Sequence, residues 1–393
     1  MRIDTDPTGA VMRTNKNVVV VGGGIGGLTA ALALRRDGHD VVVLERRRTS
    51  EEAGAGISLW PNAMRVLREL GVGEALEAAA ISDGRATIRS ARGRRLSVTD
   101  MDEIGRRYSA PLAVVHRSHL LGVLRDTVGE SALRLGATCT GIVQDDRVAC
   151  AQLADGSQIE AEVVVAADGV GSRLRDALID KGAMQATGLV AWRAVVPAEG
   201  VDVEAVAGEA WGRGALFGAA PLTGGRLYWF ASSHAAASAE GSAADERERL
   251  LERFAGWHDP IPAIIEATAP DAIIRTPLRE LAPLPAWTSG RVALLGDAAH
   301  AMLPNLGQGG CQAIEDAAAL GRSLRNGAEV PDALRAYEQS RKPRADDIAR
   351  QSRRMSAVAH LRNPAATTFR NLAMRAAPAG ATLRRLDALV NAA

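Results

Sequence analysis

A run of glycines between an apolar strand and an apolar helix constrains the fold of this chain more than any other feature. Residues 18–21 are four consecutive valines, a β-branched run typical of a buried parallel strand. The run leads directly into the spacing GxGxxG, formed by Gly22, Gly24 and Gly27, and an apolar helix then extends to about Arg36. Such a turn lets the backbone approach a pyrophosphate at the positive end of the helix. The pattern predicts an α/β fold with a dinucleotide site after the first strand.

An acidic residue follows the next predicted strand. Residues 40–44 form a second β-branched run, which ends at Glu45, 23 positions after Gly22. A carboxylate at this place can hold ribose hydroxyls. We expect Arg46, which follows Glu45, and the turn residues Ile25 and Gly26 to lie near the same nucleotide. The turn alone does not distinguish FAD from NAD.

A second strand, turn and helix occupy residues 290–310. A buried-strand pattern over 292–295 leads to Gly296-Asp297 and Pro304, and three glycines then open a helix that extends to about Leu324: Gly307, Gly309 and Gly310. Asp297 can accept hydrogen bonds from sugar-alcohol hydroxyls. The N–H groups of the glycine turn can donate to a carbonyl or a developing anion. Pro304 would form a rigid wall beside a planar ring. This layout predicts a flat, hydroxyl-bearing, weakly anionic ligand.

Three features between these motifs also point to a nucleotide. Residues 163–167 form an apolar strand that ends at Asp168-Gly169, an acid and a glycine turn. Gly54 and Gly56 permit close contact between the backbone and a ligand. Arg117 stands near the start of a predicted helix, where a positive charge is unfavourable unless an anion or a flavin edge lies nearby.

In this order, GxGxxG, Asp168-Gly169 and Gly296-Asp297 resemble the motifs of the single-component, class A (p-hydroxybenzoate-hydroxylase-like) FAD-dependent aromatic monooxygenases. The resemblance extends over nearly the whole chain. The sequence around residues 57–62 and 307–311 is most similar to the urate hydroxylase, 3-hydroxybenzoate 6-hydroxylase and salicylate hydroxylase branches. The resemblance implies tightly bound, non-covalent FAD, with NAD(P)H as a transient co-substrate. It also implies O2 as oxidant and a C4a-hydroperoxyflavin that hydroxylates or epoxidises an aromatic or heteroaromatic small molecule.

The resemblance also implies roles for individual residues. Asp297 would hold the ribityl chain, and Gly309 and Gly310 would stabilise negative charge on the flavin. Arg117 would contact FAD. Asp168 would organise the pyrophosphate region by orienting water, backbone or an arginine such as Arg173.

The predicted architecture is a discontinuous Rossmann-type FAD-binding domain, a smaller antiparallel-sheet substrate domain and C-terminal helices. The expected boundaries are a flexible tail over 1–16, the FAD-binding domain over 17–82, 111–180 and 286–345, the substrate domain over 83–110 and 181–285, and a C-terminal helical segment over 346–393. A length of 393 residues fits two closely connected domains.

The substrate domain supplies the other candidate catalytic residues beside Pro304. Period-2 alternation places Arg193 and Trp192 on opposite faces of one strand, and Tyr228 and Trp229 on opposite faces of another. The sequence does not say which face meets the flavin. Tyr228 is a candidate base, His300 a poorer one, and Arg193 a candidate anion contact. The urate branch has an arginine where this chain has Leu216, which argues against urate as substrate.

Two alternatives remain. One is a flavin-dependent halogenase or a reductase on the same fold, although the chain has no Trp-x-Trp and only three lysines. The other is an FAD-binding protein with a non-catalytic, membrane-docking role. Residues 353–393 carry seven arginines and one acid, and apolar residues at helical spacing (Leu372, Leu383, Leu386, Leu389 and Val390). We expect this tail to pack on the FAD-binding domain or a partner subunit, with membrane contact as the alternative.

Composition limits the remaining function classes. Lysine and arginine number 47 against 46 acidic residues, so no net field favours nucleic acid. Three cysteines without a CxxC pair argue against a secreted disulfide framework, and residues 1–16 lack the apolar segment of a signal peptide. No metal motif is present. We expect a cytoplasmic monomer or homodimer.

Overall fold

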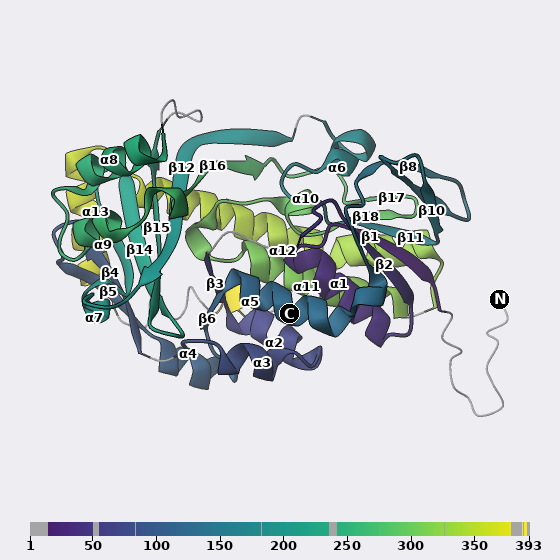
Figure 1. Ribbon diagram of the computed structural model, residues 1–393, viewed down its shortest axis with the longest axis horizontal. Helices are drawn as coiled ribbons and strands as arrows, with labels where there is room; N and C mark the ends of the chain where they lie inside the picture. Colours follow the sequence, from purple (N-terminus) through teal and green to yellow (C-terminus); the bar gives the residue numbers. More distant parts are fainter. Residues whose placement is uncertain are drawn as a thin grey trace.

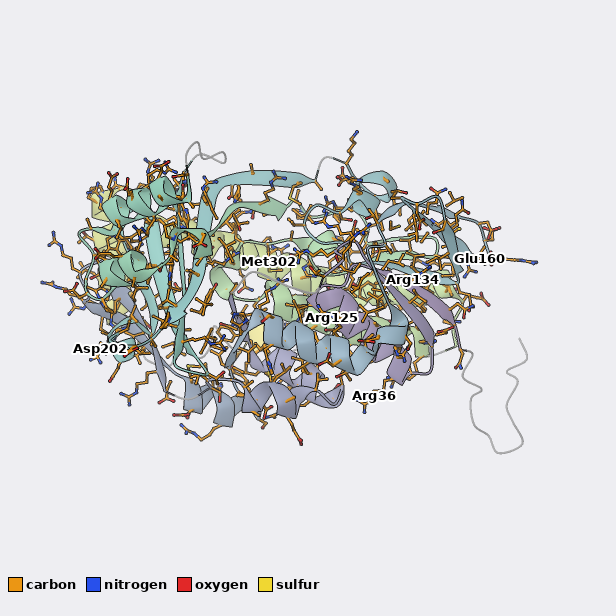
Figure 2. The ribbon with its side chains drawn as sticks, in the orientation of Figure 1. Arg36, Arg125, Arg134, Glu160, Asp202 and Met302 are labelled. Carbon is orange, nitrogen blue, oxygen red and sulfur yellow. The ribbon has the colours of Figure 1, made fainter. Side chains whose placement is uncertain are left out.

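The computed structural model describes residues 15–49, 55–82, 84–181, 183–235, 242–325, 327–378, 387 and 389–390. Two large sheets lie at opposite ends of an elongated molecule, and the long helix α12 (Val330–Ala359) runs past both of them (Figure 1). Met302 lies in the middle of the molecule, whereas Asp202 and Arg134 lie towards opposite ends (Figure 2).

The first sheet has six strands in the order β17-β18-β11-β1-β2-β7, and its pairs are parallel except for β17 with β18. Its strands are β17 (Thr288–Ser289), β18 (Val292–Leu294), β11 (Val163–Ala166), β1 (Asn17–Val21), β2 (Asp40–Glu45) and β7 (Leu133–Leu135). The valines of β1 and β11 are buried, as expected for strands covered on both faces. Because β1, β11 and β18 end at the same edge, their three following turns lie together.

Two small sheets flank this one. The first contains β10 (Gln158–Ala161), β9 (Ala149–Leu153) and β8 (Cys139–Gln144), and the second pairs β3 (Gly56–Leu59) with β6 (Ala113–His116). The helices beside the parallel sheet include α1 (Ile25–Arg36), α2 (Pro61–Glu69), α3 (Gly73–Ala78), α5 (Arg117–Val128), α6 (Arg173–Leu178), α10 (Asp297–His300) and α11 (Gly309–Arg325), with short 3₁₀ turns η1 (Glu130–Ala132) and η3 (Pro304–Leu306).

The second large sheet has seven strands in the order β16-β12-β15-β14-β13-β4-β5. Its strands are β16 (Ile274–Leu281), β12 (Met184–Pro197), β15 (Arg226–His234), β14 (Ala215–Leu222), β13 (Gly208–Trp211), β4 (Arg85–Ser90) and β5 (Arg95–Asp100). The sequence predicted an antiparallel sheet, and its pairs are antiparallel except for β13 with β4, which are parallel. These two strands come from distant parts of the chain and are not joined by a hairpin, so no tight turn forces them to be antiparallel.

One face of this sheet forms its own core. Phe217 and Trp229 are fully buried and stacked, with ring centroids 5.5 Å apart, and Phe254 of α8 packs edge-on against Phe217. Trp192 lies in the same cluster. The covering elements are α7 (Val203–Val206), α8 (Ala243–Phe254), α9 (Ile261–Ala267) and η2 (Pro270–Ala272). This packing leaves the opposite face, with Arg193 and Tyr228, turned towards the nucleotide-binding part.

Helix α12 connects the two ends of the molecule. Near its start the Tyr337 hydroxyl donates to the Leu294 carbonyl of β18, at 3.0 Å. Further along, Ser352 donates to the Leu303 carbonyl and Arg353 pairs with Glu280 of β16. Its end packs with Leu216 of β14. One continuous helix therefore contacts both large sheets.

The last described residues pack on the body of the molecule. Leu389 and Val390 are buried against α4 (Met101–Tyr108), and Asp387 pairs with Arg107. Leu372, in α13 (Pro364–Ala376), is instead exposed, and Leu383 and Leu386 lie outside the described residues. Lys16, included in the predicted tail, is buried and its carbonyl accepts from Asp40. The predicted domain boundaries remain predictions.

Substitution of two phenylalanines tests which side chains form the core of the seven-stranded sheet. Phe254→Ala removes a fully buried ring and leaves a cavity, so we expect the free energy of unfolding to fall by about 3–5 kcal/mol. Phe369→Ala is the control, because Phe369 is 74% exposed and its loss should change stability by no more than about 0.5 kcal/mol. Urea unfolding followed by tryptophan fluorescence measures both, and equal effects would contradict this description of the core.

Candidate functional site

The turn after β1 is shaped by contacts that exclude side chains. A Cβ atom on Gly22, whose φ is +114°, would lie 2.2 Å from the Ala167 carbonyl oxygen, and one on Gly27 would lie 1.9 Å from the Gly22 carbonyl oxygen. A Cβ on Gly24, by contrast, would meet nothing within 4 Å. Gly24 precedes Ile25, the first residue of α1, and provides no side-chain cap. The turn thus leaves open space in front of helix N–H groups that have no acceptor within the helix.

Glu45 lies against this turn. Its Oε2 accepts from the Gly23 N–H at 2.8 Å, and its Oε1 accepts from the Arg47 N–H at 2.9 Å. Each carboxylate oxygen retains capacity for a second donor, such as a ribose hydroxyl. Arg46 is exposed beside it.

Asp168 follows the end of β11, next to the same turn. Its Oδ2 accepts from the backbone N–H of Arg173 at 3.0 Å, whereas its Oδ1 is buried without a hydrogen-bond partner. Burial raises the pKa of this carboxyl above its usual value. The sequence suggested an interaction with water, backbone or Arg173, and the contact is with the backbone of Arg173.

Asp297 and the late glycines lie at the same edge of the sheet. Asp297 begins α10 and is exposed, and its Oδ1 would lie 3.9 Å from a Cβ on Gly309, the first residue of α11. Pro304 is exposed at the start of η3. Gly307 has φ +62°, and a Cβ there would lie 3.0 Å from Trp60 Nε1, a buried atom without a partner.

Gly310 brings three separate segments together. A Cβ on Gly310 would lie 3.0 Å from Ile57 Cδ1 and 3.8 Å from Ile25 Cδ1. The glycine-rich start of α11 therefore lies between the first helix and strand β3. Cys311 follows directly, and burial raises the pKa of its thiol to about 12, so it is not a reactive thiolate at neutral pH.

Gly56 connects this region to Arg117 and to the large sheet. Gly56 pairs with His116 across β3 and β6, and the Arg117 N–H donates to the Ala55 carbonyl at 2.8 Å. A Cβ on Gly56 would lie 2.4 Å from Cδ1 of Tyr228. Tyr228 therefore packs on the bare backbone of β3. Gly54 lies outside the described residues.

Tyr228 and Arg193 share the open face of the seven-stranded sheet. Arg193 pairs in register with Phe230, and Val195 pairs with Tyr228, so the two side chains are diagonal neighbours. Burial raises the pKa of Tyr228, and the nearby Arg193 guanidinium only partly opposes this. Tyr228 is therefore a neutral phenol at neutral pH, which can donate a hydrogen bond but is poorly suited to act as a base.

A buried ionic network behind the Gly296-Asp297 turn was not predicted. Asp316 Oδ2 accepts from the Gly296 N–H at 3.1 Å and from His300 Nε2 at 2.6 Å, and its Oδ1 accepts from Arg341 Nε at 2.8 Å. Arg341 also donates to Glu315 at 2.6 Å. Burial alone would raise the pKa of Asp316, but His300 and Arg341 outweigh it and lower the pKa. The turn that carries Asp297 is thus fixed to α11 and α12.

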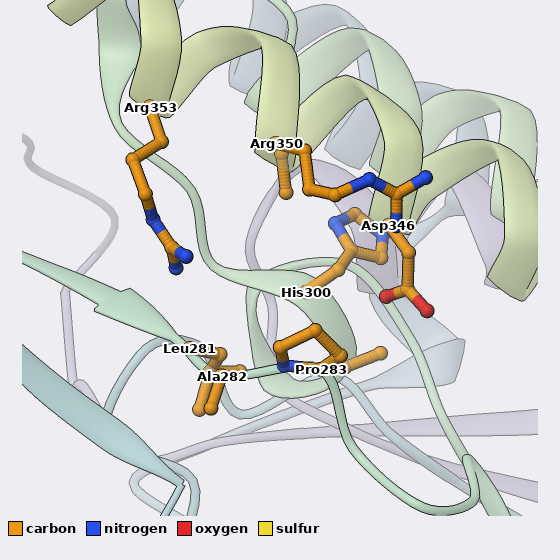
Figure 3. Close-up of a pocket in the computed structure, with 9 residues that line it drawn as sticks. Leu281, Ala282, Pro283, His300, Asp346, Arg350 and Arg353 are labelled. Carbon is orange, nitrogen blue, oxygen red and sulfur yellow. The ribbon is translucent and has the colours of Figure 1, made fainter. Parts of the chain in front are cut away.

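His300 belongs to this network and not to the open face of the sheet. Burial would lower its pKa, but the Asp316 carboxylate outweighs burial and raises it. Its ring also lines a small cavity of about 20 Å³, beside Pro283, Asp346 and Arg350 (Figure 3). This space holds about one water molecule and no substrate. His300 therefore supports the turn from behind.

These residues together fit FAD. The space before Gly24 and the glycine contacts suit a pyrophosphate, and the N–H groups at the start of α11 suit a weakly anionic ring. The unpartnered Asp168 Oδ1 offers a buried acceptor at the same edge. The GxGxxG turn, Glu45, Asp168, Asp297, Gly309 and Gly310 meet around one edge of the parallel sheet, and Gly56 and Arg117 lie on the adjoining β3–β6 pair.

Comparison with known proteins agrees with this fit. Residues 15–352 match the family described as FAD binding domain. The aurachin C monooxygenase/isomerase of Stigmatella aurantiaca is 40% identical over 367 residues, which cover 93% of this chain and 95% of that protein. An FAD-dependent urate hydroxylase of Klebsiella pneumoniae subsp. pneumoniae is 31% identical over 348 residues, covering 87% of this chain and 90% of that protein. The crystal structure of Klebsiella pneumoniae HpxO complexed with FAD and uric acid superposes with a TM-score of 0.89 at 28% identity, covering 96% of this chain and 97% of that one.

The chain therefore belongs to the FAD-binding-domain family, among the class A flavoprotein monooxygenases. It is an FAD-dependent monooxygenase. The resemblance inferred from the three motifs, the α/β fold class and the FAD cofactor are confirmed. Within the described residues, no helix is both long enough and apolar enough to span a membrane.

Two glycine variants separate cofactor binding from folding. Gly27→Ala places a methyl group against the Gly22 carbonyl, so we expect it both to destabilise the protein and to reduce FAD content. Gly24→Ala meets no protein atom, so the apoprotein should keep its melting temperature while FAD affinity falls by about tenfold or more. Calorimetry of apoprotein and fluorescence titration with FAD measure the two effects. Normal FAD affinity in Gly24→Ala would refute a pyrophosphate site at this turn.

Arg341→Met tests the ionic network. The substitution leaves the buried carboxylates of Glu315 and Asp316 without their shared partner, so the free energy of unfolding should fall by about 3–5 kcal/mol. Arg350→Met is the control, because the Arg350–Asp347 pair is about half exposed on both sides and contributes at most about 1 kcal/mol. Urea unfolding distinguishes the two, and a comparable effect of both variants would show that the network adds no special stability.

Proposed function

We propose that this enzyme uses NAD(P)H and O2 to hydroxylate or epoxidise a planar aromatic or heteroaromatic small molecule. The single observation that carries this proposal is the contact of Tyr228 with Gly56, which puts the Arg193–Tyr228 face of the sheet over the FAD-binding part. The flat ring of the substrate would lie between this face and the 304–310 loop. The HpxO complex with FAD and uric acid supports the proposal, since it shares the fold and contains a heteroaromatic ring.

FAD would supply the redox chemistry, namely the use of NAD(P)H and O2 to transfer one oxygen atom to the substrate, with the other oxygen atom leaving as water. The protein itself would bind FAD, orient the substrate beside it and exclude water from both. We propose that the GxGxxG turn, with Ile25 and Gly26, holds the pyrophosphate and that Glu45 and Arg46 contact the adenosine ribose region. Asp297 would hold the ribityl chain. Asp168 would order the backbone beside the pyrophosphate, as its bond to the Arg173 N–H suggests.

On the flavin ring, the N–H groups of Gly309 and Gly310 would stabilise negative charge. Gly56 of β3 and Arg117, which follows β6, would contact the flavin ring from this paired segment. Pro304, whose ring is exposed at the start of η3, would form an apolar wall that excludes water.

The substrate itself would meet Tyr228 and Arg193. As a neutral phenol, Tyr228 would donate a hydrogen bond to a ring oxygen or nitrogen, and Arg193 would favour a partial negative charge there. Leu216, where the urate branch resemblance places an arginine, is buried with Trp211 and Ala359. That position offers no charge to a substrate, so we propose that the substrate is not urate.

We also propose that the enzyme acts in the cytoplasm as a monomer or homodimer. Its three cysteines are unpaired, consistent with a reducing compartment.

Tyr228→Phe tests the substrate site. The variant should retain FAD and lower kcat/KM for the substrate by about 10–100-fold, because the ring keeps its packing on Gly56 but loses its donor. Tyr108→Phe is the control, because the Tyr108 hydroxyl donates to the Asp387 carboxylate and not to the Arg193–Tyr228 face, so its loss should change kcat/KM little. The substrate comes from a panel of phenolic acids, purines, quinolones and polycyclic polyketides, scored by stimulated NAD(P)H oxidation and a product one oxygen heavier. A panel that elicits no stimulated O2 consumption would count against the hydroxylase.

A further inference from the structure

Helix α13 presents an apolar face to solvent. Phe369 is 74% exposed and Leu372 57%, and Val358 at the end of α12 is 42% exposed. Seven large hydrophobic side chains are exposed among the described residues, and these three all lie within residues 358–372. Three of the seven, including the most exposed one, Phe369, therefore lie in one short segment.

The helix is held firmly with this face outward. Arg370, on its inner side, is buried and donates to the carbonyls of Val358 and Ala359 at 3.1 and 2.9 Å. Its guanidinium also lies over the Trp211 ring, 5.4 Å from the centroid. Because the inner side supplies the attachment, Phe369 and Leu372 are not needed to hold the helix in place.

Arginines without acidic neighbours in sequence surround the apolar face. Residues 353–378 contain five arginines and no acid, and so do residues 85–99, in a chain whose overall charge is only +1. The two segments meet in space, because α13 packs on β5 and the Trp211 carbonyl accepts from the Ala91 N–H and is within 3.4 Å of Arg370 Nη2. The exposed arginines of this region are Arg85, Arg92, Arg94, Arg95, Arg213, Arg353, Arg354, Arg362 and Arg375, of which Arg353 pairs with Glu280.

Acids also lie nearby, but they are fewer than the arginines. Glu280 pairs with Arg353, and Asp202 and Glu204 interact favourably with Arg89. Asp259 follows His258, whose N–H bonds to the Ala91 carbonyl, and Glu209 accepts from Trp211 Nε1. The region combines two protruding apolar side chains with a surplus of long cationic ones. Arginine side chains can extend sideways to anionic groups while apolar side chains enter a hydrocarbon layer.

We propose that α13, the end of α12 and the β4–β5 turn form a docking surface for an anionic lipid bilayer. A second copy of the chain fits less well, because a twofold interface would place this arginine-rich surface against itself. Nucleic acid fits less well, because a base could stack on Phe369 but the aliphatic side chains of Leu372 and Val358 offer it no ring. The proposed surface is the outward side of α13, whereas Met374 on the same helix packs with Leu216 and Phe230 at the end of the open face of the sheet.

Vesicle co-sedimentation of the full-length, FAD-loaded enzyme tests the proposal. Binding should occur to vesicles of phosphatidylcholine mixed with phosphatidylglycerol, should be weak with phosphatidylcholine alone, and should decrease as salt is added. Phe369→Ser with Leu372→Ser should lower partitioning by about tenfold or more. Arg362→Gln with Arg375→Gln should lower it by about thirtyfold.

Matched variants at the parallel-sheet end serve as controls. Leu135→Ser with Val143→Ser removes two side chains that are 45% and 58% exposed, and Arg36→Gln with Arg134→Gln removes two exposed charges (Figure 2). Both should leave vesicle binding and FAD content unchanged. The proposal is overturned if anionic vesicles capture no protein at low salt, or if the control and α13 variants bind alike. It is also overturned if the α13 variants change the oligomeric state, since the surface would then join two copies.

Discussion

The buried carboxylate of Asp316 is the interaction on which the cofactor site depends. It joins the Gly296 N–H, His300 and Arg341, so one side chain connects the turn before Asp297 to two long helices. A buried carboxylate is costly unless every oxygen finds a donor, and here both oxygens are satisfied. The same bonds that stabilise the protein therefore set where Asp297 stands relative to the start of α11.

The other contacts that shape the site are places where two backbone segments pack closely at a glycine. Gly22, Gly27 and Gly310 each occupy places where a Cβ would collide with, or press on, another segment. These contacts bring β1, α1, β3 and α11 close enough for their N–H groups to face a common space. The polar groups that we propose for the cofactor are mostly main-chain donors and a few carboxylates, and the protein's own contacts hold them in place.

Sequence reasoning predicted the local motifs well, because GxGxxG, Asp168-Gly169 and Gly296-Asp297 each follow an apolar strand and their chemistry is local. Alternation along β12 and β15 also separated Trp192 from Arg193 and Trp229 from Tyr228, though only the packing of α8 and α9 decides which face is open. The parallel pairing of β13 with β4 depends on a long-range register that local pattern does not contain. The Asp316 network was missed because Arg341 is 25 residues away, although two acids within an otherwise apolar helix were a usable signal.

The contact between Gly56 and Tyr228 has a consequence for how such an enzyme can change its substrate. The spacing between the large sheet and strand β3 is set where an aromatic ring rests on main chain with no side chain between. A side chain at position 56 would collide with the Tyr228 ring, and one at position 218 would collide with the Phe230 ring, 2.2 Å from its Cβ. We therefore expect changes of substrate to arise at positions that already carry a side chain, such as Leu216, while the two glycines keep the sheet at the same distance from β3.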